Sequence, residues 1–138
     1  MEVITSNGTT SICSASSYKY PNNLAYASGG FVENKMIICG GSFSDGADRF
    51  NVSCYSFGNE NEWQLHSSPK DNVASGSAAI PLLNGLWITG GSAGGKQLDS
   101  TEIVFLNGTR AKGITLPLPV KFQCAAKHKD IAILIGGI

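Results

Sequence analysis

The sequence MIICGG at Met36–Gly41 returns in similar form as LWITGG at Leu86–Gly91 and as AILIGG at Ala132–Gly137. Each copy is a short, largely apolar run that ends in two glycines. One such run would fit any buried strand that precedes a turn. Three runs, separated by 50 and then 46 residues, predict an internal repeat whose unit has the length of a small sheet.

The sequence between the Gly-Gly pairs predicts strands. It contains many short β-rich runs, such as LAYASGGFV, VSCYSF and TEIVFL, and no apolar run with a period of 3.6 residues. Asn84-Gly85 separates AAIPLL from LWIT and is typical of a two-residue hairpin turn. Glu33–Lys35 and Lys127–Asp130 occupy the same place before the other two runs. Each Gly-Gly pair is therefore expected to end the second strand of a hairpin in an all-β fold.

A longer repeat shows that units of two types alternate. MEVITSNGTTS at the N-terminus matches TEIVFLNGTRA at an offset of 100 residues, in Glu2/Glu102 and in the shared Asn-Gly-Thr. We expect four segments: the end of one unit at about 1–20, full units at 21–70 and 71–118, and an opening hairpin at 119–138. Met1 stands where the parallel unit has Thr101, inside a strand pattern, so we expect a fragment of a larger protein.

Composition and charge limit the classes of function. The chain has 138 residues, of which 42% are hydrophobic and 14% are charged, with 17 glycines, and this fits a folded, turn-rich chain. Ten basic residues balance ten acidic ones, so nucleic acid and anionic membranes are poor partners. The apolar runs are too short to cross a bilayer, and the N-terminus lacks a signal-peptide pattern. We expect no membrane insertion.

The middle of the chain resembles the repeat of the Kelch β-propeller family. It has a strand with Tyr55, a polar turn, Trp63, an inner strand, and then an apolar strand closed by Gly-Gly. The resemblance implies four-stranded antiparallel blades, and about three of them form an incomplete ring, because propellers close with about four to eight. The Asn-Gly-Thr units depart from the family because they lack its Trp. The structural repeat markers are Gly40, Gly41, Tyr55, Trp63, Gly90, Gly91, Gly136 and Gly137.

The cysteines favour an extracellular chain. Their spacing contains no zinc motif, which leaves disulfides or plain buried thiols. Alternating units with Cys before Gly-Gly resemble the cysteine-bearing, mostly extracellular Kelch-like proteins of invertebrates. On that resemblance Cys39 and Cys54 lie on the second and third strands of one blade, where a cross-strand disulfide would close a loop of about 15 residues. Cys13 and Cys124 have no assigned partner. Three sequons are candidate glycosylation sites, at Asn7, Asn51 and Asn107.

The sequence contains no recognisable catalytic motif. His66 and His128 have no metal-ligating residue at useful spacing, and Ser75–Ala79 does not form a Gly-x-Ser-x-Gly nucleophile turn. Asp45 and Asp48 do not have the carboxylates of a calcium loop. We therefore expect no catalysis by this chain, no metal and no cofactor.

We expect a non-catalytic module for binding a protein or a glycan. In a propeller, the loops after the Gly-Gly strand and those that enter the inner strand lie on one face, and this is an argument from architecture. The candidate contact residues in these loops are Asn22, Asn23, Phe43, Arg49, Asp71 and Asn72. Two alternatives remain: a propeller segment of a secreted galactose-oxidase-like enzyme, and an intracellular Kelch adaptor with reduced cysteines.

Overall fold

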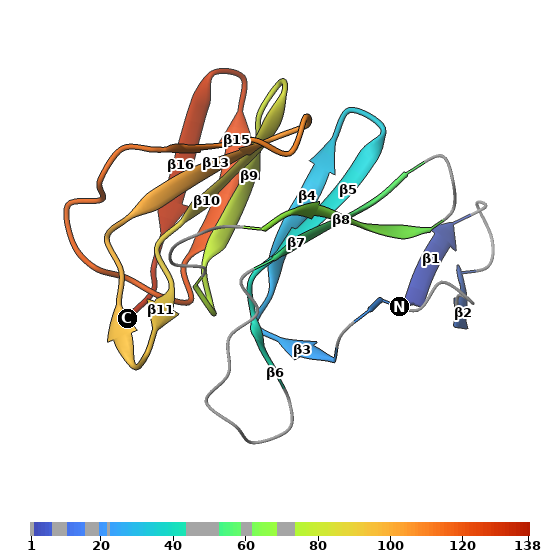
Figure 1. Ribbon diagram of the computed structural model, residues 1–138, viewed down its shortest axis with the longest axis horizontal. Helices are drawn as coiled ribbons and strands as arrows, with labels where there is room; N and C mark the ends of the chain where they lie inside the picture. Colours follow the sequence, from blue (N-terminus) through green and yellow to red (C-terminus); the bar gives the residue numbers. More distant parts are fainter. Residues whose placement is uncertain are drawn as a thin grey trace.

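The computed structural model describes residues 2–6, 11–15, 20–21, 23–43, 53–58, 62–68 and 74–138, with only the backbone of 2–6 and 11–15 (Figure 1). All regular structure in these ranges consists of β-strands, which confirms the all-β prediction. No helix in them is long and apolar enough to cross a membrane. The sheets have two to four strands, and none of the described sheets closes on itself.

Two antiparallel sheets of four strands form the body of the molecule. The first contains β4 (Ser28–Val32), β5 (Lys35–Cys39), β7 (Cys54–Phe57) and β8 (Trp63–Ser67), in that spatial order. The second has the same order, with β9 (Ala78–Pro81), β10 (Gly85–Thr89), β13 (Thr101–Phe105) and β14 (Arg110–Lys112). They lie within the predicted units 21–70 and 71–118, and the assignment of these units as Kelch blades stays a prediction.

Four shorter strand pairs accompany the two sheets. Two are hairpins near the ends of the chain: β1 (Glu2–Ser6) with β2 (Ser11–Ala15), and β15 (Cys124–His128) with β16 (Ile131–Ile135). The other two lie beyond the Gly-Gly ends of the sheets: β3 (Leu24–Ala25) with β6 (Ser42–Phe43), and β11 (Ser92–Ala93) with β12 (Lys96–Gln97). Figure 1 shows β3, β6 and β11 together at one end of the molecule, opposite the hairpin turns.

The hairpin turns agree with the sequence in two units and differ in the third. Glu33 and Lys129 begin the two-residue turns of their hairpins, with φ of 51° and 52°. In the second unit the turn is Leu83–Asn84, one residue earlier than predicted, because Leu82 N–H donates to the Gly85 carbonyl. Gly85 instead begins β10. A Cβ there would lie 2.7 Å from the Val104 carbonyl oxygen, so packing between strands accounts for this glycine.

The core lies between the two four-stranded sheets. We call the face of each unit that points along the chain toward the following unit its leading face, and the opposite face its trailing face. The leading face of the first sheet packs on the trailing face of the second, and Gly30 allows close contact with Pro81 and Leu86. Each fully buried aliphatic side chain contributes about 1.5 to 3 kcal/mol. The buried residues of this seam are Val32, Ile37, Cys39, Cys54, Leu86, Ile88 and Val104.

A disulfide links the first sheet across β5 and β7. Cys39 and Cys54 are register partners with a Cα–Cα distance of 4.1 Å, and both are fully buried. The predicted pairing is therefore confirmed. The second sheet has Thr89 opposite Thr101 at these positions. Cys124 is a free, exposed thiol, and the side chain of Cys13 lies outside the described part of the chain.

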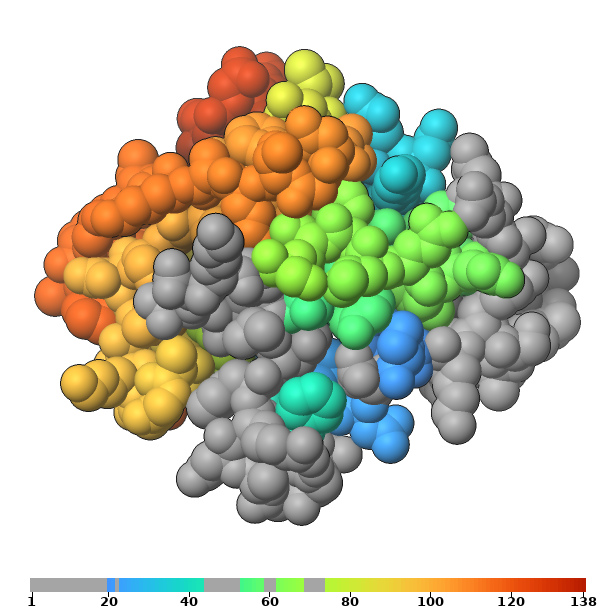
Figure 2. Space-filling view, in the orientation of Figure 1, coloured from blue at the N-terminus to red at the C-terminus, as the bar shows by residue number. Residues whose placement is uncertain are grey.

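Polar contacts join the outer strands of the two sheets. Arg110 takes the register position of Trp63 and donates from Nε to Ser67 Oγ at 2.7 Å. Its guanidinium also contacts Cys54 Sγ at 3.0 Å and pairs with Glu102 at 2.7 Å. Burial raises the pKa of Glu102, and Arg110 opposes this rise. Figure 2 shows β8 (green) directly against the orange segment that includes β14, the strand of Arg110.

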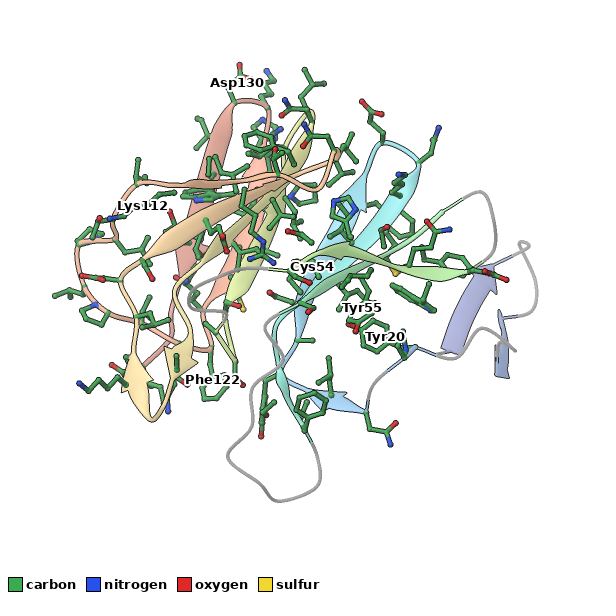
Figure 3. All side chains as sticks on the ribbon, in the orientation of Figure 1. Tyr20, Cys54, Tyr55, Lys112, Phe122 and Asp130 are labelled. Carbon is green, nitrogen blue, oxygen red and sulfur yellow. A yellow bond between two sulfur atoms is a disulfide. The ribbon has the colours of Figure 1, made fainter. Side chains whose placement is uncertain are left out.

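The predicted repeat markers Tyr55 and Trp63 belong to an aromatic cluster on the trailing face of the first sheet. Trp63 lies edge-on to Tyr20 with ring centroids 4.8 Å apart. Tyr20 and Tyr55 lie side by side (Figure 3), with ring centroids 5.6 Å apart. The Tyr20 hydroxyl and Trp63 Nε1 are buried and have no hydrogen-bond partner among the described residues. Burial, with a smaller effect of Tyr55, raises the pKa of Tyr20 to about 12. Trp63 therefore lies outside the core shared by the two four-stranded sheets.

Candidate interaction surface

The Gly-Gly pairs place consecutive units in contact at one end of the sheets. All six glycines have positive φ, from 60° to 99°. The Gly41 N–H is directed at the Ala74 carbonyl at 3.4 Å, and the Gly91 N–H donates to the Val120 carbonyl at 2.7 Å. A Cβ on Gly90 would overlap the Val120 carbonyl oxygen. The motif thus combines a left-handed backbone with space for the backbone of the following unit.

A second repeated position lies two residues before each inner strand. It holds Tyr26, Gly76 and Phe122, which have positive φ of 58°, 71° and 59°. Gly76 N–H donates to the Tyr26 carbonyl at 2.9 Å, and Phe122 N–H donates to the Gly76 carbonyl at 2.7 Å. These bonds connect three consecutive units through their backbones. A bulky residue with positive φ is an outlier, and such outliers cluster at functional sites.

The two aromatic residues at this position form an exposed pair. The rings of Tyr26 and Phe122 lie 5.3 Å apart at 55°, although 96 residues separate them in sequence. Tyr26 is 63% exposed and Phe122 is 48% exposed. A Cβ on Gly76 would lie 2.6 Å from the Phe122 ring, so the glycine leaves room for that ring. Lys121 Nζ lies 5.2 Å from the centre of the Phe122 ring, within cation–π range.

The predicted contact residues Asn23 and Phe43 lie at this same end. Asn23 is exposed and precedes β3, whose Leu24 pairs with Phe43 of β6. The bridge between Ser75 and Ser92 repeats this pairing in the second unit. The segment that enters an inner strand therefore pairs with the segment that follows a Gly-Gly pair in both units. Asn22, Arg49, Asp71 and Asn72 lie outside the described residues.

Sequence reasoning did not select Tyr26 and Phe122. The signal was present, because both align with Gly76 when the Gly-Gly pairs are superimposed, and a glycine at a repeated position indicates a positive φ. Figure 3 shows Phe122 at the end of the sheets opposite the hairpin turn that carries Asp130. We call Tyr26, Gly76, Lys121 and Phe122 the aromatic end surface.

Other side chains named in the sequence analysis have different surroundings. The Asn107 side-chain oxygen accepts hydrogen bonds from the backbone and hydroxyl of Thr109, on the exposed β13–β14 turn. Asn7 and Asn51 lie outside the described residues. His66 Nε2 contacts the Phe105 carbonyl at 2.8 Å, and His128 is exposed on β15. The described part of the chain contains no group of three or more His, Cys, Asp or Glu residues that could hold a metal ion.

A cavity of about 430 Å³ lies near a hairpin turn at the other end of the first sheet. Glu33, Lys35 and Glu62 are among its lining residues, together with the partly buried Leu106 of the turn that follows β13. Its described lining residues include no aromatic side chain, and among them only Glu33 of the turn is a non-glycine residue with positive φ. The aromatic end surface is therefore the stronger candidate for binding.

No protein-family model matches this chain, and no curated protein matches it.

Proposed function

We propose that this chain consists of Kelch-like β-propeller blades and binds a protein ligand through the aromatic end surface, without catalysis of its own. The observation that carries the proposal is the exposed pair of Tyr26 and Phe122, both held at positive φ by backbone hydrogen bonds to Gly76. Exposed aromatic side chains supply large contact areas and are enriched at protein interfaces.

The topology supports the blade assignment. Two meanders of four antiparallel strands stack face to face, and the same backbone contacts link consecutive units at the Gly-Gly ends. These features fit blades arranged around an axis near Tyr26, Gly76 and Phe122.

The Cys39–Cys54 disulfide supports an extracellular location. Disulfides persist in oxidising compartments and are rare in the cytosol. Mass mapping of the native protein under non-reducing conditions tests this point. An extracellular chain is expected to contain the disulfide, whereas full alkylation of Cys39 and Cys54 without prior reduction would contradict that location.

Substitution of the aromatic pair tests the binding surface. Peptides that bind the wild-type chain are first selected from a displayed random library. Their affinities are then measured for wild type, Tyr26→Gly and Phe122→Gly. Glycine adopts positive φ without strain, so both variants retain the backbone conformation of this end. Loss of a central aromatic contact costs about 2 kcal/mol or more, so each variant is expected to bind at least about 30-fold more weakly.

Leu83→Ser is the matched control for these variants. Leu83 is a large apolar residue that is 85% exposed in the β9–β10 turn, at the other end of the sheet. Its substitution is expected to leave binding unchanged. Equal losses in all three variants, or no loss in Tyr26→Gly and Phe122→Gly, would refute the assignment. A glycan array probed with the same variants separates a protein ligand from a sugar.

A further inference from the structure

Consecutive units of the chain stack in the same orientation. The leading face of the first sheet, with Ile37 fully buried, packs on Leu86 and Ile88 in the trailing face of the second. The second sheet is covered in turn, because β15 lies along β9 and Gln123 Nε2 donates to the Thr89 carbonyl at 2.9 Å. A leading face therefore meets a trailing face at both seams.

A leading face remains exposed at the last hairpin. Ile131, Ile133 and Ile135 of β16 are 61%, 43% and 65% exposed. Superposition of the Gly-Gly pairs places Ile133 at the position of Ile37 and Ile135 at the position of Cys39, both of which are fully buried in the first sheet. The exposed isoleucines thus occupy positions that form a core one unit earlier.

A trailing face remains exposed on the inner strands of the first sheet. Gly29, Phe31, Met36 and Ile38 line a cavity of about 350 Å³, and Phe31 is 63% exposed. In the repeat, Met36 and Ile38 correspond to Leu86 and Ile88, the residues that receive Ile37. The described residues that line this cavity include no charged side chain.

We propose that the leading face of β15–β16 binds the trailing face of β4–β5 in a second copy of this chain. The partner is a second copy because the chain itself presents both matching halves of a seam that it already forms internally. Such a contact joins unlike faces, and a heterologous contact of this kind either closes into a ring or continues as a filament. The contact is distinct from the aromatic end surface and does not depend on its ligand.

Two single substitutions and their mixture test the contact. Ile133→Asp places a charge on the leading face, and Phe31→Asp places one on the trailing face. A charge buried without a partner is costly, so each variant is expected to dissociate at least about 100-fold more readily than wild type. Both residues are substantially exposed in one chain, so neither substitution is expected to prevent folding.

The mixture distinguishes the proposed contact from other modes of association. By sedimentation equilibrium, wild type is expected to associate, each variant alone to be monomeric, and the mixture to form a 1:1 complex through its remaining pair of intact faces. A monomeric wild type at about 100 µM, where a micromolar contact would be nearly saturated, would overturn the proposal. Loss of self-association in only one of the two variants would also overturn the proposal, because that result indicates contact between like faces.

A cross-link tests the register of the contact. At the internal seam, Ser28 Oγ lies 3.1 Å from Ser77 Oγ. The repeat places Cys124 at the position of Ser28 and Ala27 at the position of Ser77. Cys124 of one copy should therefore lie opposite Ala27 of the other.

The cross-linking experiment mixes wild type with Ala27→Cys in a Cys124→Ser background. Oxidised glutathione accepts the two electrons and two protons of the thiol pair and is reduced to two glutathione molecules. Peptide mapping is expected to find Cys124 joined to the new cysteine at least about 10-fold more often than to one introduced at Leu83. Equal yields of the cross-link at residues 27 and 83 would overturn the proposed register. So would a cross-link at residue 27 whose yield is unchanged by Ile133→Asp.

Discussion

Gly90 and Gly136 occupy the same repeated position and permit a controlled test of the Gly-Gly motif. Their φ angles are 60° and 71°, so alanine is strained by a similar amount at both. Their surroundings differ. A Cβ on Gly90 would overlap the Val120 carbonyl oxygen and lie 2.8 Å from Gln123 Nε2, whereas no atom lies within 4 Å of a Cβ on Gly136.

These surroundings set the expected magnitudes. A left-handed conformation costs a non-glycine residue about 1 to 2 kcal/mol, which is the full expected loss for Gly136→Ala. Gly90→Ala also displaces backbone and disturbs the bond from Gly91 N–H to the Val120 carbonyl. Overpacking of this kind costs about 1 to 3 kcal/mol, so the total loss is about 2 to 5 kcal/mol.

Urea denaturation, followed by tryptophan fluorescence, measures the free energy of unfolding of both variants. The measurement uses an Ile133→Asp background, so that self-association does not contribute. Gly90→Ala is expected to be less stable than Gly136→Ala by at least about 1 kcal/mol. Equal losses in the two variants would contradict this prediction, because the close approach of the following unit to Gly90 would then have no energetic consequence.

Two further predictions concern the first seam. Replacing both Cys39 and Cys54 with Ala is expected to lower the free energy of unfolding by about 3 kcal/mol in urea denaturation, as for a loop of this length, whereas Cys124→Ser should change it by less than about 0.5 kcal/mol. Burial raises the pKa of Glu102 above its ordinary value of 4.5. Protonated Glu102 therefore stabilises the fold below that pH, and this contribution is lost as the pH rises through the folded-state pKa. Glu102→Gln stays neutral, so its free energy of unfolding should rise relative to that of wild type as the pH increases above 4.5; a difference that stays constant with pH would contradict this.

The sequence predicted the features that depend on local backbone chemistry. The ends of β5, β10 and β16 follow from the Gly-Gly pairs, and the Cys39–Cys54 pair follows from the expected order of strands. The β9–β10 turn was placed one residue too late, because Asn84-Gly85 has the composition of a type I′ turn. Gly85 serves packing against β13, and single-sequence reasoning does not contain that contact.

The polar contacts between the two sheets could not be predicted from the sequence, for a related reason. Arg110 lies 43 residues from Ser67 and 56 from Cys54, and its role depends on how two sheets stack. A missing Trp in the second unit was visible in the sequence. Its replacement by an arginine that contacts the disulfide of the preceding unit required the register of β13 and β14.

Under the proposed function, stability and binding compete at the repeated position that Tyr26 and Phe122 occupy. Glycine serves this position at residue 76, yet the flanking units hold aromatic residues at φ of 58° and 59°, with a conformational cost of about 1 to 2 kcal/mol each. The buried part of each ring offsets this cost only partly, since Tyr26 is 63% exposed. Folding alone would therefore favour glycine at residue 26. Tyr26→Gly is expected to retain the stability of wild type within about 1 kcal/mol while it loses binding, because glycine releases the strain and removes the exposed ring.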